Sequence, residues 1–280
     1  MSMYYAGIIS DIGILVLGAL SVYVILATGQ LSLGNAGFMG IGAYLTSWLT
    51  VVAGLPITAA LIVAALVSGV IGIAVGFPAL RLKGVYLAMA TLGFGEMVRS
   101  FFQNFGSMGG PEGFHGMHHV STGYIWTWAA IVLVVVMVIE ASPIWLEIRA
   151  VRDDETAAGL VGVNATEIKV GAFGCGAAVA AIAGGLFAHH YVYIEPGNFS
   201  FERSVDFVLA VILGGSTVAP GALAGAVMLV VLPEYLRFLA EWRFAAFGVL
   251  LIGMLLVRRQ GLLDRTLLRF FVSGPRTGAR

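Results

Sequence analysis

About eight long apolar segments, joined by short polar connections, constrain the fold of this 280-residue chain more than any other feature. A helix rises about 1.5 Å per residue, so roughly 20 apolar residues cross the hydrocarbon core of a bilayer. Charged residues make up only 11% of the chain, whereas about a quarter is usual in a soluble domain. We therefore predict an all-α, polytopic helical membrane protein. The segments are residues 8–28, 35–53, 57–80, 84–102, 123–141, 168–190, 205–236 and 245–257.

The seventh segment, 205–236, is too long for a single crossing. Its middle contains the helix-breaking sequences GGST at 214–217 and PG at 220–221. Such breaks are tolerated inside a membrane where protein covers them. We expect a broken or re-entrant pair there, and about 8–9 transmembrane helices in total.

The basic residues set the orientation of the spans. With residues 147–166 in the cytoplasm and two crossings in the seventh segment, most Lys and Arg residues face the cytoplasm, as the positive-inside rule requires. The exceptions on the outer side are Arg99, Arg203, Arg237 and Arg243. We predict one transmembrane domain over 1–270, with an outside N-terminus, and a cytoplasmic tail at 271–280.

The most charge-dense connection between spans is 149–162. Its pattern predicts a short, Ala-rich helix with acidic residues near the start, where the helix dipole favours negative charge, and with Gly162 as the stop residue. The segment is either a solvated loop helix or a docking helix that transmits force from a cytoplasmic partner. Its charged residues are Arg149, Arg152, Asp153, Asp154 and Glu155.

Within this segment, Ala157, Ala158 and Gly162 resemble the core of the motif by which permeases of ABC importers dock onto their ATPase subunits. Other stretches resemble one branch of those permeases, the LivM-like subunit of the Liv-type branched-chain amino acid importers. Asn35 and Met108 depart from that pattern, since many relatives carry His and Thr there. The similar stretches, in chain order, are GQLSLGNAGF at 29–38, ALRLKGVYLA at 79–88, TLGFGE at 91–96, GGPEG at 109–113, LGG at 213–215, GA at 225–226 and RRQGL at 258–262.

The resemblance implies a division of labour among several chains. A permease of this kind forms half of a translocation pathway and pairs with a homologous second permease. Two cytoplasmic ATPase subunits and an extracytoplasmic solute-binding protein complete the importer. This sequence has no Gly-x-x-x-x-Gly-Lys-Ser/Thr phosphate loop, so ATP and Mg are expected in the partner ATPases, with no cofactor bound here.

The expected solute is a branched-chain or related hydrophobic amino acid, and the expected location is the bacterial cytoplasmic (inner) membrane. Urea, short amides and aromatic acids stay open as solutes of the same importer class. A stand-alone secondary carrier would need coupling-ion residues. An intramembrane enzyme would need a buried nucleophile–base or metal pair, and we predict no catalytic residues.

Polar groups in two apolar segments are candidates for the pathway. Gln30, Ser32 and Asn35 form a polar seam that either caps a helix or lines the route, because unwound backbone at membrane depth usually borders a cavity. Glu96 and Arg99 lie within one apolar helix at a spacing that allows a mutual ion pair. Intramembrane charges are also functional candidates, so a pathway role for Glu96 stays open.

Small residues recur every four positions in the sixth segment, from Ala172 through Gly176, Ala180 and Gly184 to Ala188. Such a row lets another helix approach closely. Gly221 and Gly225 form a further pair of this kind. These positions serve either packing within the chain or contact with a second membrane subunit. Cys175, the single cysteine, is expected to be a small packed core residue.

The histidines are predicted to fall together on the outer side: His115, His118, His119, His189 and His190. Their spacing suggests a metal site, but no cysteine or carboxylate set completes a ligand group, so we expect no bound metal. The formal net charge of zero argues against nucleic acid as a partner. Membrane lipid is the expected surroundings.

Overall fold

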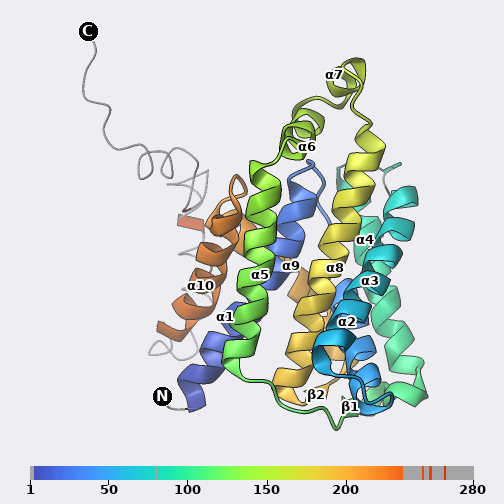
Figure 1. The fold of residues 1–280 in the computed structure, drawn as a ribbon, viewed down its shortest axis with the longest axis vertical. Helices are drawn as coiled ribbons and strands as arrows, with labels where there is room; N and C mark the ends of the chain where they lie inside the picture. Colours follow the sequence, from blue (N-terminus) through green and yellow to red (C-terminus); the bar gives the residue numbers. More distant parts are fainter. Residues whose placement is uncertain are drawn as a thin grey trace.

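The computed structural model describes residues 3–79, 81–82, 84–235, 248, 252–253 and 262. In this part of the chain, most helices run side by side as a bundle (Figure 1). Helix α1 (Met3–Leu26) lies inside the bundle, where Leu17, Leu20 and Tyr23 have no exposed surface. Apolar residues on every side of α1 account for this position, because a helix that is hydrophobic all round is a buried one.

The spans predicted from the sequence correspond to helices whose ends differ by a few residues. The all-α, multi-pass membrane architecture is confirmed. After α1 these helices are α2 (Asn35–Val51), α3 (Ile57–Ala79), α4 (Val85–Asn104), α5 (Thr122–Ala141) and α8 (Ala165–Tyr191).

The number of spans is not confirmed. Within the described residues, α1, α3, α5 and α8 are long and apolar enough to cross a membrane, and one bent helix pair raises the total from four to five. Helix α2 has only 17 residues, and α4 contains Glu96 and Arg99. Most of the predicted span at 245–257, the RRQGL stretch apart from Leu262, and the tail at 271–280 lie outside the described residues.

Helix α8 is the main packing partner of α1, α2 and α3. Its small residues allow this: a Cβ at Gly184 would lie 1.9 Å from the carbonyl oxygen of Met39 in α2, and one at Gly176 would lie 2.7 Å from that of Ser21 in α1. The row of small residues therefore lies in helix contacts within the chain.

The predicted break in the seventh segment is present. The chain bends by 115° between helices α9 (Phe201–Gly214) and α10 (Ala219–Tyr235). Gly221 and Gly225 let the two helices approach, since a Cβ at Gly225 would lie 1.8 Å from the carbonyl oxygen of Ala210. These two glycines also lie in a contact within the chain.

The two ends of the bundle differ. At one end, strands β1 (Phe114–His115) and β2 (Tyr193–Ile194) pair antiparallel, beside the short 3-10 helices η1 (Gly106–Met108), η2 (Gly110–Glu112) and η3 (Pro196–Phe199). At the other end, helices α6 (Ile144–Asp153) and α7 (Glu155–Leu160) form the connection between α5 and α8 (Figure 1). We call these the β1–β2 end and the α7 end.

Candidate functional site

The α6–α7 segment, residues 144–160, projects beyond the ends of α5 and α8 (Figure 1). Helix α6 lies against the bundle through Trp145, Ile148 and Val151, which are buried and recur every three residues on one helix face. Helix α7 forms the tip. Leu160 at its end and Val161 directly after it are 86% and 78% exposed. The tip of the projection is therefore apolar.

The sequence predicted one short helix here, and the structure has two. Asp154 explains the split, because its extended backbone ends α6 and its Oδ1 accepts hydrogen bonds from the N–H groups of Thr156 (2.8 Å) and Ala157 (3.0 Å). It is thus the N-cap of α7. Gly162 lies just beyond α7 with a φ of +89°, as expected of a stop residue.

The other predicted docking residues lie on the same projection. Ala158 is the buried residue of α7, while Arg152, Asp153 and Ala157 are exposed and Arg149 is half-buried. The Glu155 carboxylate accepts from Lys169 Nζ at 2.7 Å, which ties α7 to the start of α8. This ion pair is a direct link between the projection and the bundle.

The polar connection between α1 and α2 meets α6 directly. Gly29 has a φ of +81°, and a Cβ there would lie 3.6 Å from the Cα of Arg152. A cavity of about 660 Å³ lies at this contact, lined by residues of the connection, of α4 and of α6. The connection between α1 and α2, which contains Gln30 and Ser32 of the polar seam, thus contacts α6.

The polar seam itself is buried: Gln30, Ser32 and Asn35 are at most 5% exposed. Asn35 Nδ2 donates to Ser21 Oγ at 2.8 Å, and Ser32 Oγ accepts from Gly34 N at 3.3 Å. Among the described residues, Asn35 Oδ1 has no hydrogen-bond partner although it is buried. An unpaired buried acceptor of this kind needs a water or a solute to satisfy it.

Two side chains from distant helices hold the seam in place. Thr91 Oγ1 of α4 accepts from Leu33 N, and Ser204 Oγ of α9 accepts from Ala36 N, each at 3.0 Å. Neither Ser204 nor Ser21 stood out in the sequence, because a single serine in an apolar helix carries no pattern. Thr91 lies in the TLGFGE stretch, so its place in that motif could have identified it as a functional candidate.

Glu96 and Arg99 form the ion pair that their spacing allowed, with Arg99 Nη1 donating to Glu96 Oε2 at 3.1 Å. Their side chains are 41% and 37% exposed on the surface of α4. Charges at membrane depth that face acyl chains cost at least about 3 kcal/mol. The face of α4 that bears this pair is therefore suited to water or protein and not to lipid.

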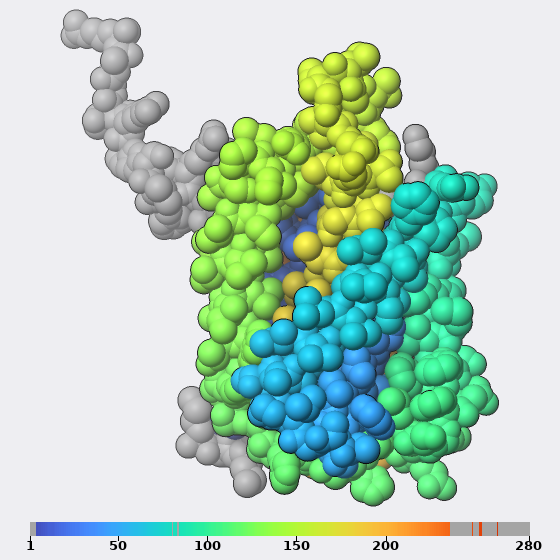
Figure 2. Space-filling view, turned by 45° about the vertical axis from the view of Figure 1, so that its right-hand side comes forward, coloured from blue at the N-terminus to red at the C-terminus, as the bar shows by residue number. Residues whose placement is uncertain are grey.

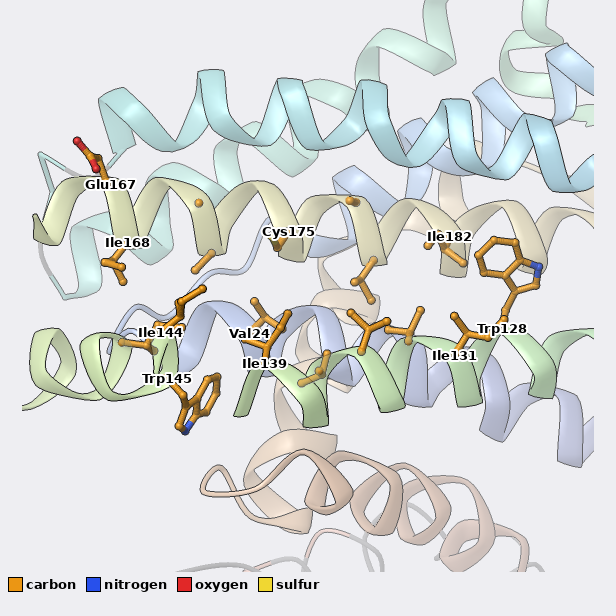
Figure 3. Close-up of a pocket in the computed structure, with 18 residues that line it drawn as sticks. Val24, Trp128, Ile131, Ile139, Ile144, Trp145, Glu167, Ile168, Cys175 and Ile182 are labelled. Atoms are coloured by element: carbon orange, nitrogen blue, oxygen red, sulfur yellow. The ribbon is translucent and has the colours of Figure 1, made fainter. Parts of the chain in front are cut away.

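An apolar groove runs along the bundle between α5 and α8, with a volume of about 560 Å³ (Figure 3). Figure 2 shows it as a hollow between α5 and α3, with parts of α8 and α1 at its base. Trp128 marks one end, and Glu167, the one charged residue among the described residues that line it, marks the other (Figure 3). Such a lining suits the acyl chains of a bilayer.

Cys175 lines this groove and is exposed, so its prediction as a packed core residue is wrong. The error has a simple cause. Cys175 lies on the same face of α8 as Gly171, Ala178 and Ile182, which also line the groove.

All five histidines lie toward the β1–β2 end. His189 Nε2 lies 3.0 Å from Thr50 Oγ1, and His119 Nδ1 lies 3.0 Å from the carbonyl oxygen of His190. No group of three or more His, Cys, Asp and Glu side chains in the described part of the chain is arranged to hold a metal ion.

Comparison with known proteins identifies relatives over most of the chain. Residues 4–258 match the family described as the permease component of branched-chain amino acid transport systems. The permease protein LivM of the high-affinity branched-chain amino acid transport system of Salmonella typhimurium is 34% identical over 95% of this chain and 69% of its own length. LivM of Escherichia coli is 33% identical, over 85% of this chain and 65% of its own length.

A second kind of permease from the same system is also similar. LivH of Salmonella typhimurium is 35% identical over 42% of this chain. The aligned regions span about two thirds of the length of the two LivM proteins. No solved structure matches the chain at a significant level.

Proposed function

This chain belongs to the permease components of branched-chain amino acid transport systems, and we propose that it forms half of the translocation pathway of an ATP-driven importer. The proposed solutes are branched-chain or related hydrophobic amino acids, as the names of its LivM relatives suggest. The second half would come from a homologous permease of the LivH kind, and the proposed location is the bacterial inner membrane.

The observation that carries this proposal is the projecting α6–α7 segment with its apolar tip. Leu160 and Val161 are among the most exposed apolar side chains in the described part of the chain, although the tip lies beyond the apolar spans. Exposed apolar groups in water mark a protein interaction site. We assign this tip to a cytoplasmic ATPase subunit, which would hydrolyse ATP with Mg while this chain performs no chemical step.

The pathway is proposed to follow the α4 face that bears Glu96 and Arg99, and to include the seam at Gln30, Ser32 and Asn35. Two observations support this placement: the ion pair is exposed on the surface of α4, and Asn35 Oδ1 lacks a partner among the described residues. An ion pair offers both signs of charge, which suits a zwitterionic amino acid delivered by an extracytoplasmic binding protein.

The test is Leu160→Asp in the complete importer, with Gly159→Ala as the matched control. Gly159 lies in the same helix with open space around it. We expect Leu160→Asp to abolish co-purification of the ATPase subunits while insertion into the membrane is unchanged, and Gly159→Ala to have no effect. Undiminished co-purification and ATP-driven uptake in Leu160→Asp would contradict the docking role.

A further inference from the structure

A half-buried acidic residue lies where three parts of the bundle meet. Glu140, near the end of α5, accepts a hydrogen bond from the backbone N–H of Ala219 at 2.9 Å. Ala219 is the first residue of α10 and directly follows the break between α9 and α10. The first N–H groups of a helix have no partner within it, and they favour a negative charge. Glu140 therefore fixes the position of the break relative to α5.

The same carboxylate also accepts a hydrogen bond from α1. The hydroxyl of Tyr23, a residue with no exposed surface, donates to Glu140 Oε1. One oxygen thus joins α1, α5 and α10, although Tyr23 and Glu140 are 117 residues apart. A half-buried carboxylate is stabilised by such donors.

The Tyr23 ring in turn contacts α6, the helix that carries the projection. Trp145 of α6 is 5% exposed and stacks on Tyr23, with ring centroids 6.0 Å apart and planes 20° apart. Glu140, Trp145 and Arg149 also line one cavity of about 350 Å³ at the corner between α5 and α6. A displacement of α6 would therefore act on both partners of the hydrogen bond between Tyr23 and Glu140.

We propose that Tyr23 and Glu140 are positioning residues that transmit movement of α6 to the break between α9 and α10. This inference rests on the proposed function, because it takes α6–α7 as the element that the ATPase moves. The route is a contiguous set of contacts, Trp145 to Tyr23 to Glu140 to Ala219, each between different elements. Packed contacts of this kind carry coupling between distant sites when the element they hold has two positions.

The experiment measures solute taken up per ATP hydrolysed by the complete importer in proteoliposomes, for Tyr23→Phe, Glu140→Gln and Glu140→Ala. Glutamine keeps an acceptor oxygen for Ala219 N–H and Tyr23, whereas alanine removes it. We expect the ratio to fall about five-fold or more in Glu140→Ala and about two-fold or more in Tyr23→Phe. In Glu140→Gln it should stay near that of the unmodified importer.

Tyr44→Phe is the matched control. Tyr44 is as buried as Tyr23 but its hydroxyl has no hydrogen-bond partner among the described residues. Equal ratios in Tyr23→Phe and Tyr44→Phe would overturn the proposal, as would a normal ratio in Glu140→Ala. If Glu140→Ala fails to assemble, the two phenylalanine variants decide alone, since each removes a single oxygen atom.

The outcome also separates this inference from the function it rests on. If the unmodified chain shows no ATP-driven uptake with its partners, the proposed function fails. If uptake is normal and Tyr23→Phe matches Tyr44→Phe, only the positioning role fails. A coupling defect in both Tyr23→Phe and Glu140→Ala that is no larger in the double variant would support action through their shared hydrogen bond.

Discussion

At the scale of single residues, the most informative positions are polar side chains in surroundings where an apolar side chain would cost less free energy. Glu96 and Arg99 pair on the surface of α4, and Glu140 joins three helices. Asn35 is buried, and its Oδ1 has no hydrogen-bond partner within the part of the chain that the structure describes. Each costs free energy in a membrane unless a partner or water satisfies it. The proposal of a pathway near α4 and the start of α2 rests on three of them, Asn35, Glu96 and Arg99.

Neutralising the ion pair distinguishes a structural role in α4 from a role in the pathway. Glu96→Gln leaves Arg99 without its carboxylate partner, so we expect a lower unfolding temperature in detergent and reduced uptake. The double variant Glu96→Gln/Arg99→Gln removes both charges and should recover the unfolding temperature without recovering uptake. Recovery of uptake together with stability would show that the pair serves packing only.

The sequence predicts residues well where a local pattern exists and poorly where it does not. The Glu96–Arg99 pair was expected because the two residues are one helical turn apart. The contact between Tyr23 and Glu140 was not, because the bundle brings together residues 117 positions apart. The orientation of Cys175 was missed for a related reason: in a helix that is apolar all round, composition does not tell the packed face from the groove-lining face.

At the scale of elements, the α6–α7 segment combines two properties that docking requires. Its base, α6, packs on the bundle through the buried Trp145, Ile148 and Val151, and α7 is joined to α8 by the ion pair between Glu155 and Lys169. Its tip is exposed and apolar. Apolar runs predicted the long helices within a few residues. The split at Asp154 was missed, because consecutive acidic residues are equally compatible with the start of a single helix.

The cap at Asp154 is expected to hold α7 in shape for its partner. Asp154→Ala removes the acceptor for Thr156 N and Ala157 N, which costs on the order of 1 kcal/mol of helix stability. Faster amide hydrogen exchange in α7 and weaker ATPase co-purification should follow. Asp154→Ser keeps an acceptor oxygen and should behave nearly as the unmodified chain. Equal defects in both variants would indicate that the charge, and not the cap, matters.

At the scale of the whole molecule, the bundle has two different ends and a side with an apolar groove. The α7 end carries Arg149, Arg152 and Lys169, and the β1–β2 end carries the histidines. From the positive-inside rule we expect the α7 end to face the cytoplasm. The division into a domain at 1–270 and a tail at 271–280 stays a prediction, because much of 236–280 lies outside the described residues.

Sidedness can be measured by cysteine labelling in a Cys175→Ala background. Gly159→Cys in α7 and His118→Cys in the connection at the β1–β2 end both replace exposed residues. We expect a membrane-impermeant maleimide to label His118→Cys in intact spheroplasts and Gly159→Cys only in inside-out vesicles. The reverse pattern would place the α7 end outside and exclude its contact with a cytoplasmic ATPase.

The measurement that tests the central claim most directly is leucine uptake into proteoliposomes that contain this chain, its second permease, the ATPase subunits and the binding protein. The account predicts uptake that requires ATP, Mg and every one of these chains, that persists without an ion gradient, and that is lost with Leu160→Asp. Uptake by this chain alone, driven by a proton or sodium gradient and indifferent to ATP, would contradict it.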